Sequence, residues 1–476
     1  MDETSITAYP FYRLHAHPQS KRMAYNDSMS ENVNITLPPY ALRAIEVLEN
    51  AGFEAWCVGG CVRDAILGRQ VNDYDIATNA LWAETERVLR NEGFAIHRTG
   101  TAHGTVTASI DGHALEITTY RSEGSYSDGR HPDTVDFVRS IEEDLARRDF
   151  TINALAYHPI RGLLDCHGGL MDLQEKTIRV VGDGRERFSE DALRILRACR
   201  FCAQLGFTIE PNTLQALVEN KMRILGVSSE RITHELQELL LGEYVHDALL
   251  ECVDVLGAIM PELAACKGFD QHTPYHIYDV LEHTAWVVQR VPAKPLVRWA
   301  ALFHDLGKPG AFFMDGQRAH FYGHPRLSEI LARDIMERLC LSPRFKQQVL
   351  MLVRIHDRTI PARARNVKRT LASMDGNVDL FRALCQLKRA DALAQSHLSE
   401  PRIQLAHDLE RVLDEVIEQN AAFTVRQLAI TGNDVIDLGI PAGPAVGEAL
   451  NAALDAVIDE HLPNERKALL QFVRNR

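Results

Sequence analysis

The sequence predicts an α+β fold, in which a mixed sheet with helices is followed by a mostly helical remainder. Two patterns lead to this prediction. Between Glu54 and about Thr119, short alternating segments typical of strands mix with helical ones. Beyond Phe188, apolar residues recur at helical spacing almost throughout. The length of 476 residues is too great for one core, so three or four subdomains are expected.

The first elements follow from local signals. Residues 1–36 are polar and lack periodicity, which predicts a disordered N-terminal tail. Pro38-Pro39 then opens an amphipathic helix. Its apolar positions are Ala41, Leu42, Ile45 and Leu48. Further on, residues 105–110 and 114–119 alternate on either side of Asp111-Gly112, which predicts a β-hairpin.

The second half is predicted to be helical. Helices are expected over residues 192–205, 214–219, 229–240 and 244–256, and over most of 272–395. From about Phe423 a turn-rich segment precedes a helical end.

Composition restricts the class of protein. The net charge of −13 argues against a surface that binds nucleic acid everywhere, although a local basic groove remains compatible with it. Neither a membrane-spanning run nor a signal peptide is expected. The nine cysteines form no disulfide or zinc framework, and the one CxxC, Cys199 and Cys202, lies in a helical pattern and indicates helix packing. This cysteine usage suits the reducing cytoplasm.

Two closely spaced aspartates are the first candidate site. Asp73 and Asp75 would lie on one face of a strand, where two like charges favour a divalent metal that could hold a triphosphate. Such pairs are also common in loops without metal. Just upstream, Gly59-Gly60 ends an apolar run and opens a helix-like segment carrying Arg63, where backbone N–H groups could bind phosphate. Glu116 is either a third acidic group on the neighbouring strand or an ordinary surface residue.

Two arginine-rich segments follow. Arg147-Arg148 precedes an apolar segment that we expect to be helical; it suits a phosphate ligand, or else a helix start capped by Asp149. In the next segment, Asp191 and Arg194 are three residues apart on a predicted helix and could read the Watson–Crick edge of a base, as an acceptor and a donor. A solvated salt bridge is the alternative. Arg197 and Arg200 continue the same row.

These motifs, in this order, carry a specific resemblance. They are Gly59-Gly60, Arg63-Asp64, Asp73 with Asp75, Thr119-Tyr120-Arg121, the run from Asp128 to Pro132, Arg147-Arg148-Asp149, Asp165 to Leu173, and Glu190-Asp191 with Arg194. The set resembles the class II tRNA nucleotidyltransferase and bacterial poly(A) polymerase family. The resemblance covers residues from about 38 to 260, and the tail from about 424 is similar to the family's tRNA-binding end.

The resemblance implies a polymerase-β-like nucleotidyltransferase head at residues 37–160, a helical neck at 161–265 and a tRNA-binding tail at 401–476. The implied substrates are tRNA, CTP and ATP, with CCA as the product and no membrane or obligate protein partner. Asp73 and Asp75 would bind catalytic Mg²⁺, with Glu116 as a third acidic group. The implied nucleotide-binding residues are Gly59, Gly60, Arg63, Arg148, Asp191, Arg194, Arg197 and Arg200.

The product stays open among the members of this family. The loop Ser122–Pro132 resembles that of complete CCA-adding enzymes, and its Gly, Ser and Asp content suits a mobile element. Addition of CC alone, addition of A alone, and poly(A) synthesis are the alternatives, since the other motifs are shared.

A histidine-rich region, residues 266–400, resembles an HD-type metal phosphohydrolase domain. Its candidate ligands are His283, His304, Asp305, His324, His356 and Asp391. Imidazole and carboxylate groups from several helices can hold one or two divalent ions that activate water. Such a domain could prepare tRNA ends for CCA repair, or it could be a structural spacer. A phosphohydrolase whose head only binds RNA is the rival function from another class.

Overall fold

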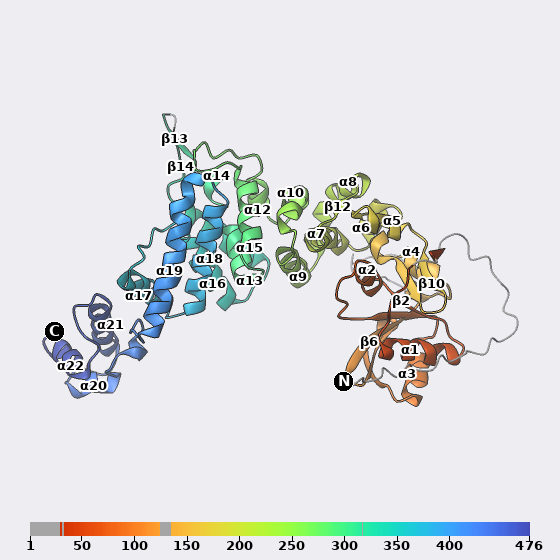
Figure 1. Ribbon diagram of the computed structural model, residues 1–476, viewed down its shortest axis with the longest axis horizontal. Helices are drawn as coiled ribbons and strands as arrows, with labels where there is room; N and C mark the ends of the chain where they lie inside the picture. The colour runs from red at the N-terminus through yellow and green to blue at the C-terminus, as the bar shows by residue number, and fades with distance from the viewer. Residues whose placement is uncertain (1–28, 31–32, 124–134, 317) are drawn as a thin grey trace, which may run out of the picture. The chain divides into compact units, whose positions relative to one another are not determined.

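The computed structural model describes residues 29–30, 33–123, 135–316 and 318–476, and its elements are labelled in Figure 1. The chain divides into two compact units. The first runs to Thr119 and takes up the chain again for Leu155–Cys166, and the second comprises Tyr120–Ala154 and His167–Arg476. Residues 124–132 of the loop Ser122–Pro132, and most of the predicted N-terminal tail, lie outside the described residues. The predicted domain boundaries stay predictions.

The first unit is built on a mixed sheet, which over the described residues has eight strands in the order β1-β10-β9-β2-β3-β6-β5-β4. The strands are β1 (Met29–Ser30), β2 (Ala55–Val58), β3 (Asp75–Thr78), β4 (Ala95–Gly100), β5 (Thr105–Ile110), β6 (His113–Thr119), β9 (Leu155–His158) and β10 (Gly162–Asp165). Only β3 and β6 pair in parallel; the other neighbours are antiparallel. The mixed sheet of the predicted α+β fold is confirmed.

Helices pack against the strands of this sheet. The helices of the unit are α1 (Pro39–Asn50), α2 (Gly60–Ile66) and α3 (Trp82–Asn91). Helix α1 begins where Pro38-Pro39 predicts and buries Ala41, Ile45 and Leu48. It packs with α3 against the sheet. On β6, Leu115 and Ile117 are buried while Glu116 is exposed, because successive strand residues point to opposite faces.

The predicted hairpin forms as the turn signal requires. Strands β5 and β6 pair in antiparallel register. Asp111 and Gly112 lie between them with φ of 53° and 82°, the left-handed conformations of a two-residue turn whose twist matches that of the strands.

The second unit is mostly helical, as predicted. Its helices are α4 (Ile141–Ala146), α5 (Gly169–Gln174), α6 (Gly184–Glu190), α7 (Leu193–Leu205), α8 (Pro211–Asn220), α9 (Ser229–Leu240), α10 (Val245–Leu256), α11 (Pro261–Ala264), α12 (Val280–Arg290), α13 (Pro295–Phe303), α14 (Lys308–Ala311), α15 (His324–Arg338), α16 (Pro343–Ile355), α17 (Ala364–Ser373), α18 (Val378–Leu393), α19 (Glu400–Glu418), α20 (Gly432–Asp437), α21 (Pro444–Ile458) and α22 (Arg466–Arg474). Four short strand pairings accompany them: β7 (Arg121–Glu123) with β8 (Val135–Phe137), β11 (Thr177–Ile178) with β12 (Thr208–Ile209), β13 (Phe313–Asp315) with β14 (Arg318–His320), and the bridge between Phe150 and Val180.

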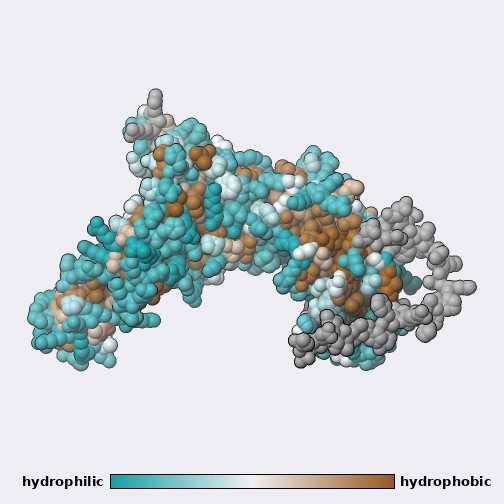
Figure 2. Space-filling view, in the orientation of Figure 1, coloured by the Kyte–Doolittle hydropathy of each residue, from teal (hydrophilic) through white to brown (hydrophobic). Residues whose placement is uncertain are grey.

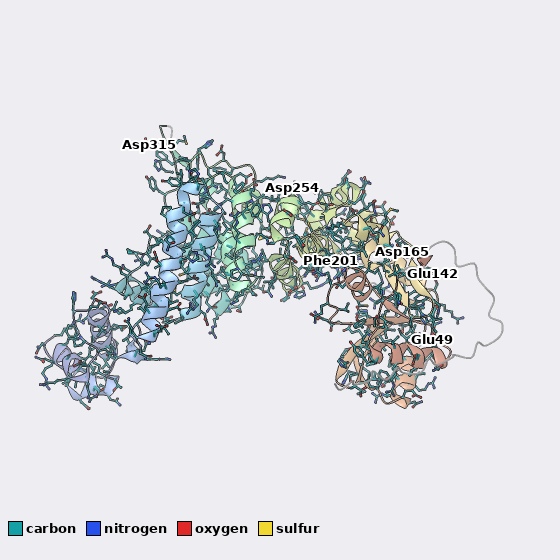
Figure 3. All side chains as sticks on the ribbon, viewed as in Figure 1. Glu49, Glu142, Asp165, Phe201, Asp254 and Asp315 are labelled. Atoms are coloured by element: carbon teal, nitrogen blue, oxygen red, sulfur yellow. The ribbon has the colours of Figure 1, made fainter. Side chains whose placement is uncertain are left out.

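Helix α7 forms the centre of the region that was predicted as the neck. It packs against both α9 and α10. Cys199 and Cys202 are buried in it as unpaired thiols, which confirms the reading of the CxxC as helix packing. Phe201, labelled in Figure 3, packs edge-to-face against Phe150 with ring centroids 5.8 Å apart.

One local prediction is wrong. The apolar segment after Arg147-Arg148 is not a helix but a single 3₁₀ turn, Thr151–Asn153, followed by β9. The reason is a long-range pairing: the Thr151 N–H donates to the Arg179 carbonyl at 2.9 Å, and the Val181 N–H donates to the Asp149 carbonyl at 3.1 Å. These bonds take the backbone partners that a helix would need.

The C-terminal helices α20, α21 and α22 share a small core of their own, which includes Val435, Ala453 and Leu469. Hydrophilic residues cover most of the face drawn in Figure 2, in keeping with a charged fraction of 25%. Within the described ranges, no helix combines the length and apolarity needed to cross a bilayer.

Candidate active site and metal centre

The acidic edge of the first unit forms where β3 begins. Parallel pairing of β3 with β6 places Asp75 opposite Glu116 in register, so the two side chains leave the same face of the sheet on adjacent strands, about 4.8 Å apart. Strand β3 starts at Asp75, so Asp73 lies just before the strand rather than within it. All three carboxylates are exposed. The expectation that Asp73 and Asp75 lie on one strand is therefore wrong. Instead, Asp75 on β3 lies beside Glu116 on β6, and Asp73 precedes β3.

The glycine pair lies at the junction of β2 and α2. Gly59 has φ 78° and ψ −131°, which an L side chain rarely adopts, and its N–H donates to the Leu155 carbonyl at 3.0 Å. Helix α2 begins at Gly60, and the first N–H groups of a helix have no acceptor within it. Arg63 is buried on α2, where its Nε and Nη2 donate to the two carboxylate oxygens of Asp64 at 2.9 and 3.0 Å. The predicted sequence of strand, turn and helix is thus present.

In the second unit, Arg147 and Arg148 both pair with one carboxylate. Arg147 Nη2 lies 2.8 Å from Asp144 Oδ1, and Arg148 Nη2 lies 3.3 Å from Asp144 Oδ2. Burial alone would raise the pKa of Asp144, but the two guanidinium groups outweigh it and lower that pKa. Asp144, one helical turn upstream on α4, therefore orients the pair that was predicted to meet phosphate.

The row of arginines on α7 is matched by buried carboxylates. Arg197 lies 2.6 Å from Asp149 through Nη2, and Arg200 lies 3.1 Å from Glu235 through Nε. Asp149 also accepts a hydrogen bond from the backbone N–H of Phe150 at 2.8 Å. The alternative prediction, that Asp149 caps a helix, is wrong because no α-helix follows; Asp149 is instead the ion-pair partner of Arg197. The arrangement fits a scaffold for the α7 face, and nucleotide contact by Arg197 and Arg200 stays a prediction.

Asp191 lies in the turn between α6 and α7, not on a helix as predicted, and Arg194 lies in the first turn of α7. Asp191 accepts from the Leu193 N–H at 3.0 Å through Oδ1 and from Arg231 Nη2 at 3.1 Å through Oδ2. Arg194 donates from Nη1 to Glu190 at 2.6 Å and from Nη2 to the Arg147 carbonyl at 3.1 Å. Each of the two polar groups is thus held by other residues, and base reading by Asp191 and Arg194 stays a prediction.

The sequence patterns did not single out the two α9 residues that pair with this region, Arg231 and Glu235. They lie four residues apart on the predicted helix 229–240, hence on one face. That spacing on a helix bordering a basic helix was the available signal.

The six predicted ligands of the histidine-rich region converge. His283 lies on α12, His304 and Asp305 follow α13, His324 opens α15, His356 follows α16 and Asp391 lies on α18. All six are buried. Their potential ligand atoms form two compact groups that share Asp305, one with His283 and His304 and the other with His324 and His356. The structure therefore brings together side chains up to 108 positions apart, as His283 and Asp391 show.

Further residues support this cluster. Arg402 Nη2 donates to Asp391 Oδ2 and Gln395 Nε2 donates to Asp391 Oδ1, each at 2.8 Å. Lys308 Nζ lies 2.6 Å from Asp305 Oδ2. Burial would raise the pKa of Asp305, yet His304 and Lys308 hold it well below its usual range. Both aspartates are therefore held as carboxylates, the form that binds metal.

Similarity to known proteins follows the same order along the chain. The poly(A) polymerase head domain matches residues 55–179. The probable RNA- and SrmB-binding site of polymerase A matches residues 206–267. The putative tRNA nucleotidyltransferase domain 2 matches residues 325–473.

Whole-chain relatives agree. A CCA-adding enzyme of Pediococcus pentosaceus is 35% identical over 91% of this chain and 96% of its own length. One from Geobacillus stearothermophilus is 31% identical over 92% of this chain and 98% of its own length. The solved structure of a Bacillus stearothermophilus CCA-adding enzyme in complex with CTP has a TM-score of 0.70 at 28% identity, covering 93% of this chain and 98% of that chain. A Thermotoga maritima CCA-adding enzyme complexed with tRNA shares the fold, with a TM-score of 0.55 at 19% identity over 92% of this chain and 96% of that chain. The chain therefore belongs to the CCA-adding family of tRNA nucleotidyltransferases.

Proposed function

We propose that this protein adds CMP, CMP and AMP from CTP and ATP to the 3′ end of tRNA without a nucleic-acid template. The observation that carries the proposal is the pairing of Asp75 with Glu116 beside Asp73, in a chain whose similarity to CCA-adding enzymes spans nearly its whole length. The related Bacillus stearothermophilus structure holds CTP, which supports the same nucleotide here.

The exposed acidic edge fits a magnesium ion, because Mg²⁺ prefers oxygen ligands from one or two carboxylates and keeps several waters. Asp73 and Asp75, with Glu116, would hold it; when bound, it neutralises the triphosphate and favours attack by the terminal 3′ hydroxyl. The N–H groups at Gly59-Gly60, together with Arg63, would position the phosphates, and positioning accounts for the remaining catalysis.

Base choice would rest on Asp191 and Arg194. A carboxylate accepts from the exocyclic amino group that cytosine and adenine both carry and uracil lacks. Arg194 would donate to a ring nitrogen or carbonyl at the same edge. Arg231 Nη2 donates to Asp191 Oδ2 at 3.1 Å. This contact would fix the orientation of the Asp191 carboxylate before the nucleotide binds.

The test is incorporation on a tRNA that lacks its 3′ CCA, with CTP alone, ATP alone, and both. The proposal expects two C additions with CTP, one further A with both nucleotides, and then a stop. Processive A tails on unrelated RNA would establish poly(A) synthesis instead, and addition limited to CC or to A would establish the narrower activities. The variant Asp73→Ala/Asp75→Ala should lose incorporation, whereas Glu46→Ala, which removes an exposed carboxylate on α1, should keep it.

We propose a second activity for the buried histidine and aspartate cluster, that of an HD-type phosphohydrolase. Nitrogen and carboxylate donors suit Zn²⁺, Mn²⁺ or a similar divalent ion, which when bound supplies an activated water. Hydrolysis of a nitrophenyl phosphodiester and of tRNA ending in a 2′,3′-cyclic phosphate should vanish in Asp305→Ala. Hydrolysis that persisted in this variant would assign the activity elsewhere or to a contaminant.

A cytoplasmic location fits both activities. All nine cysteines are free thiols, most of them buried, and a reducing compartment keeps such thiols unpaired.

A further inference from the structure

We propose that the outer face of the β13–β14 strand pair is a stacking platform for the last bases of a single-stranded RNA. Three aromatic side chains form this aromatic face: Phe313, His320 and Tyr322. The terminal phosphate of the RNA would then reach the buried histidine and aspartate cluster. The proposal rests on the second proposed activity and names its substrate class, an RNA 3′ end rather than a small phosphate ester.

The strand pair lies between two members of the cluster along the chain. It comes after Asp305 and the short helix α14, and it ends just before His324. Both ends are fixed to the cluster: His324 Nδ1 lies 2.9 Å from the Phe321 carbonyl oxygen, and Lys308, the ion-pair partner of Asp305, places Nζ 5.7 Å from the centre of the Phe321 ring. In Figure 1 the strand pair projects beyond the neighbouring helices. A ligand on it would therefore lie beside the cluster and outside the helical core.

Alternation along the strands separates inner rings from outer ones. The register pairs Phe313 with His320, so the preceding Phe312 lies opposite Phe321. The Phe312 and Phe321 rings are in contact, with centroids 5.8 Å apart, and both are partly buried. Neighbouring strand residues point the opposite way, so Phe313, His320 and Tyr322 share the outer face.

The outer rings are accessible to a ligand. Tyr322 is 78% exposed and Phe313 is 60% exposed. His320 and Tyr322 stack nearly parallel, with ring centroids 4.9 Å apart and 9° between the ring planes. Aromatic rings that are exposed side by side mark an interaction site, whereas single exposed apolar residues do not. A nucleobase stacks on such rings whatever its identity, because every base has a π-face.

The cluster is most open on the side of this face. The side chain of His324 is 10% exposed, compared with 3% for His356 and none for His283 and His304. His324 is separated from Tyr322 by one residue, so a chain end that enters at His324 passes the aromatic face. A partner protein would also cover these rings, but it would bring no phosphate to the cluster. An RNA end accounts for both features.

The first test locates RNA on the full-length chain and does not depend on hydrolysis. A short single-stranded RNA with 5-iodouridine as its last base and a 3′ phosphate is irradiated with the protein, and the cross-links are mapped by mass spectrometry. We expect cross-links at Phe313, His320 or Tyr322. Cross-links elsewhere with none on the aromatic face would overturn the proposal and leave this face to a protein partner.

The second test compares two RNAs that end in a 2′,3′-cyclic phosphate and differ only in whether their last two nucleotides carry bases. With the parent protein, the KM for hydrolysis should be at least about 10-fold lower for the RNA with bases. Phe313→Ala/Tyr322→Ala should raise that KM to the value for the base-free RNA, whose own KM and kcat should not change. Phe313→Tyr/Tyr322→Phe keeps both rings and should match the parent. So should Ile160→Ala, which removes a side chain that is 68% exposed in the first unit.

The two proposals can fail separately. Equal KM values for the two RNAs with the parent protein, or an equal loss for both RNAs in Phe313→Ala/Tyr322→Ala, would overturn the platform and leave the phosphohydrolase activity standing. Cross-links on the aromatic face without hydrolysis of either RNA would contradict the phosphohydrolase activity and leave the platform standing. The replaced side chains are exposed, and an unchanged melting temperature verifies that the variants fold.

Discussion

Replacing Arg197 by Met should loosen helix α7, because it leaves Asp149 buried without its cation. Arg197 Nε and Nη2 lie 2.7 and 2.6 Å from Asp149 Oδ2. Burial would raise the pKa of Asp149, yet Arg197 and Asn153 hold it well below its usual range, so the carboxyl is charged at neutral pH. Removing one partner of such a buried pair typically costs about 3 to 5 kcal/mol.

The lower end applies here, since 33% of the Arg197 side chain is exposed. A loss of about 3 kcal/mol corresponds to roughly a 150-fold fall in protection against hydrogen exchange. The assay is therefore amide hydrogen exchange at pH 7, followed in the peptide that spans α7. It measures the free energy of local opening of this helix and does not require that the whole chain unfold in a two-state manner.

The pH dependence has a definite sign. In the parent protein the depressed pKa of Asp149 contributes stability that is complete above the unfolded pKa of about 3.9 and is lost below it. In Arg197→Met the carboxyl stays buried but loses its main cation, so its pKa rises relative to the parent and the destabilisation shrinks as the carboxyl takes up a proton. The difference between the two proteins in the free energy of opening of α7 should therefore be smaller at pH 5 than at pH 7.

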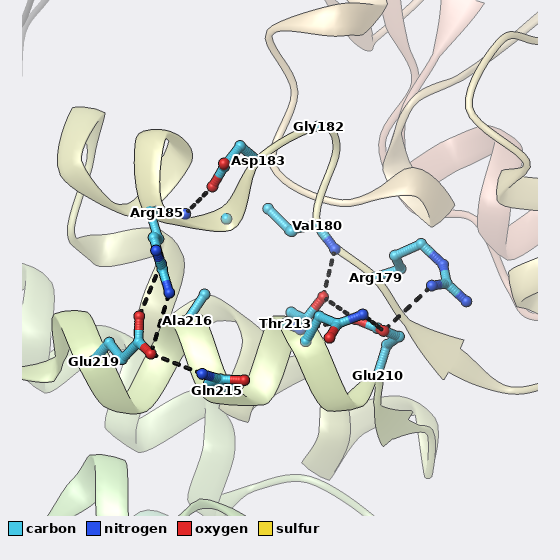
Figure 4. A pocket seen from close by; sticks show the side chains of 12 residues that line it. Arg179, Val180, Gly182, Asp183, Arg185, Glu210, Thr213, Gln215, Ala216 and Glu219 are labelled. Carbon is cyan, nitrogen blue, oxygen red and sulfur yellow. Dashed lines mark hydrogen bonds and ion pairs between the residues drawn. The ribbon is translucent and has the colours of Figure 1, made fainter.

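The matched control is Arg185→Met. Arg185 pairs with Glu219 at 2.9 Å (Figure 4), but the two side chains are 67% and 39% exposed, so the change should cost less than about 1 kcal/mol. Protection of α7 in Arg197→Met within about threefold of the parent, or equal to that of Arg185→Met, would refute the role assigned to the buried pair.

Three further outcomes are expected. Asp191→Asn should lower the preference for CTP over UTP at least about 10-fold in single-nucleotide incorporation, with the Mg²⁺ dependence unchanged; intact selectivity would rule out base reading by this carboxylate. Arg402→Gln should weaken Mn²⁺ binding to the buried centre by about 10- to 100-fold in calorimetric titration, because it removes the donor that holds a ligand; an unchanged affinity would contradict that support role. Gly242→Ala should lower the melting temperature, because its Cβ would lie 2.5 Å from the Ala203 carbonyl oxygen, whereas Gly447→Ala, with nothing within 4 Å, should not; equal melting temperatures would contradict this close approach.

Local signals predicted the elements whose partners are near in sequence. The hairpin at Asp111-Gly112 and helix α1 after Pro38 form because the turn and the proline determine them within a few residues. The segment after Arg148 was mispredicted because Thr151 finds its backbone acceptor at Arg179, and no periodicity in the segment itself reveals that pairing.

For the candidate sites too, the sequence indicated the residues but not their contacts. Residue type indicated the candidate carboxylates, arginines and histidines, since few other roles combine them in this order. What the sequence could not show is which groups face each other. The register of Asp75 with Glu116 depends on a parallel pairing across 41 positions, and the pairing of Arg197 with Asp149 spans 48. Oδ2 of Asp305 lies near His283 and His304, and Oδ1 lies near His324 and His356; this arrangement depends on the packing of four helices and could not be read from spacing.

The return of the chain to the sheet at Leu155–Cys166 makes the head an interrupted domain. Strand β9 pairs with β2 on the side away from β3. In the sequence, β9 follows residues 120–154, which belong to the other unit. A fragment ending at Thr119 would expose β2 as an unpaired edge next to the Gly59-Gly60 turn and would be prone to aggregate. A minimal folded head therefore has to be made by replacing residues 120–154 with a short linker, not by cutting the chain once.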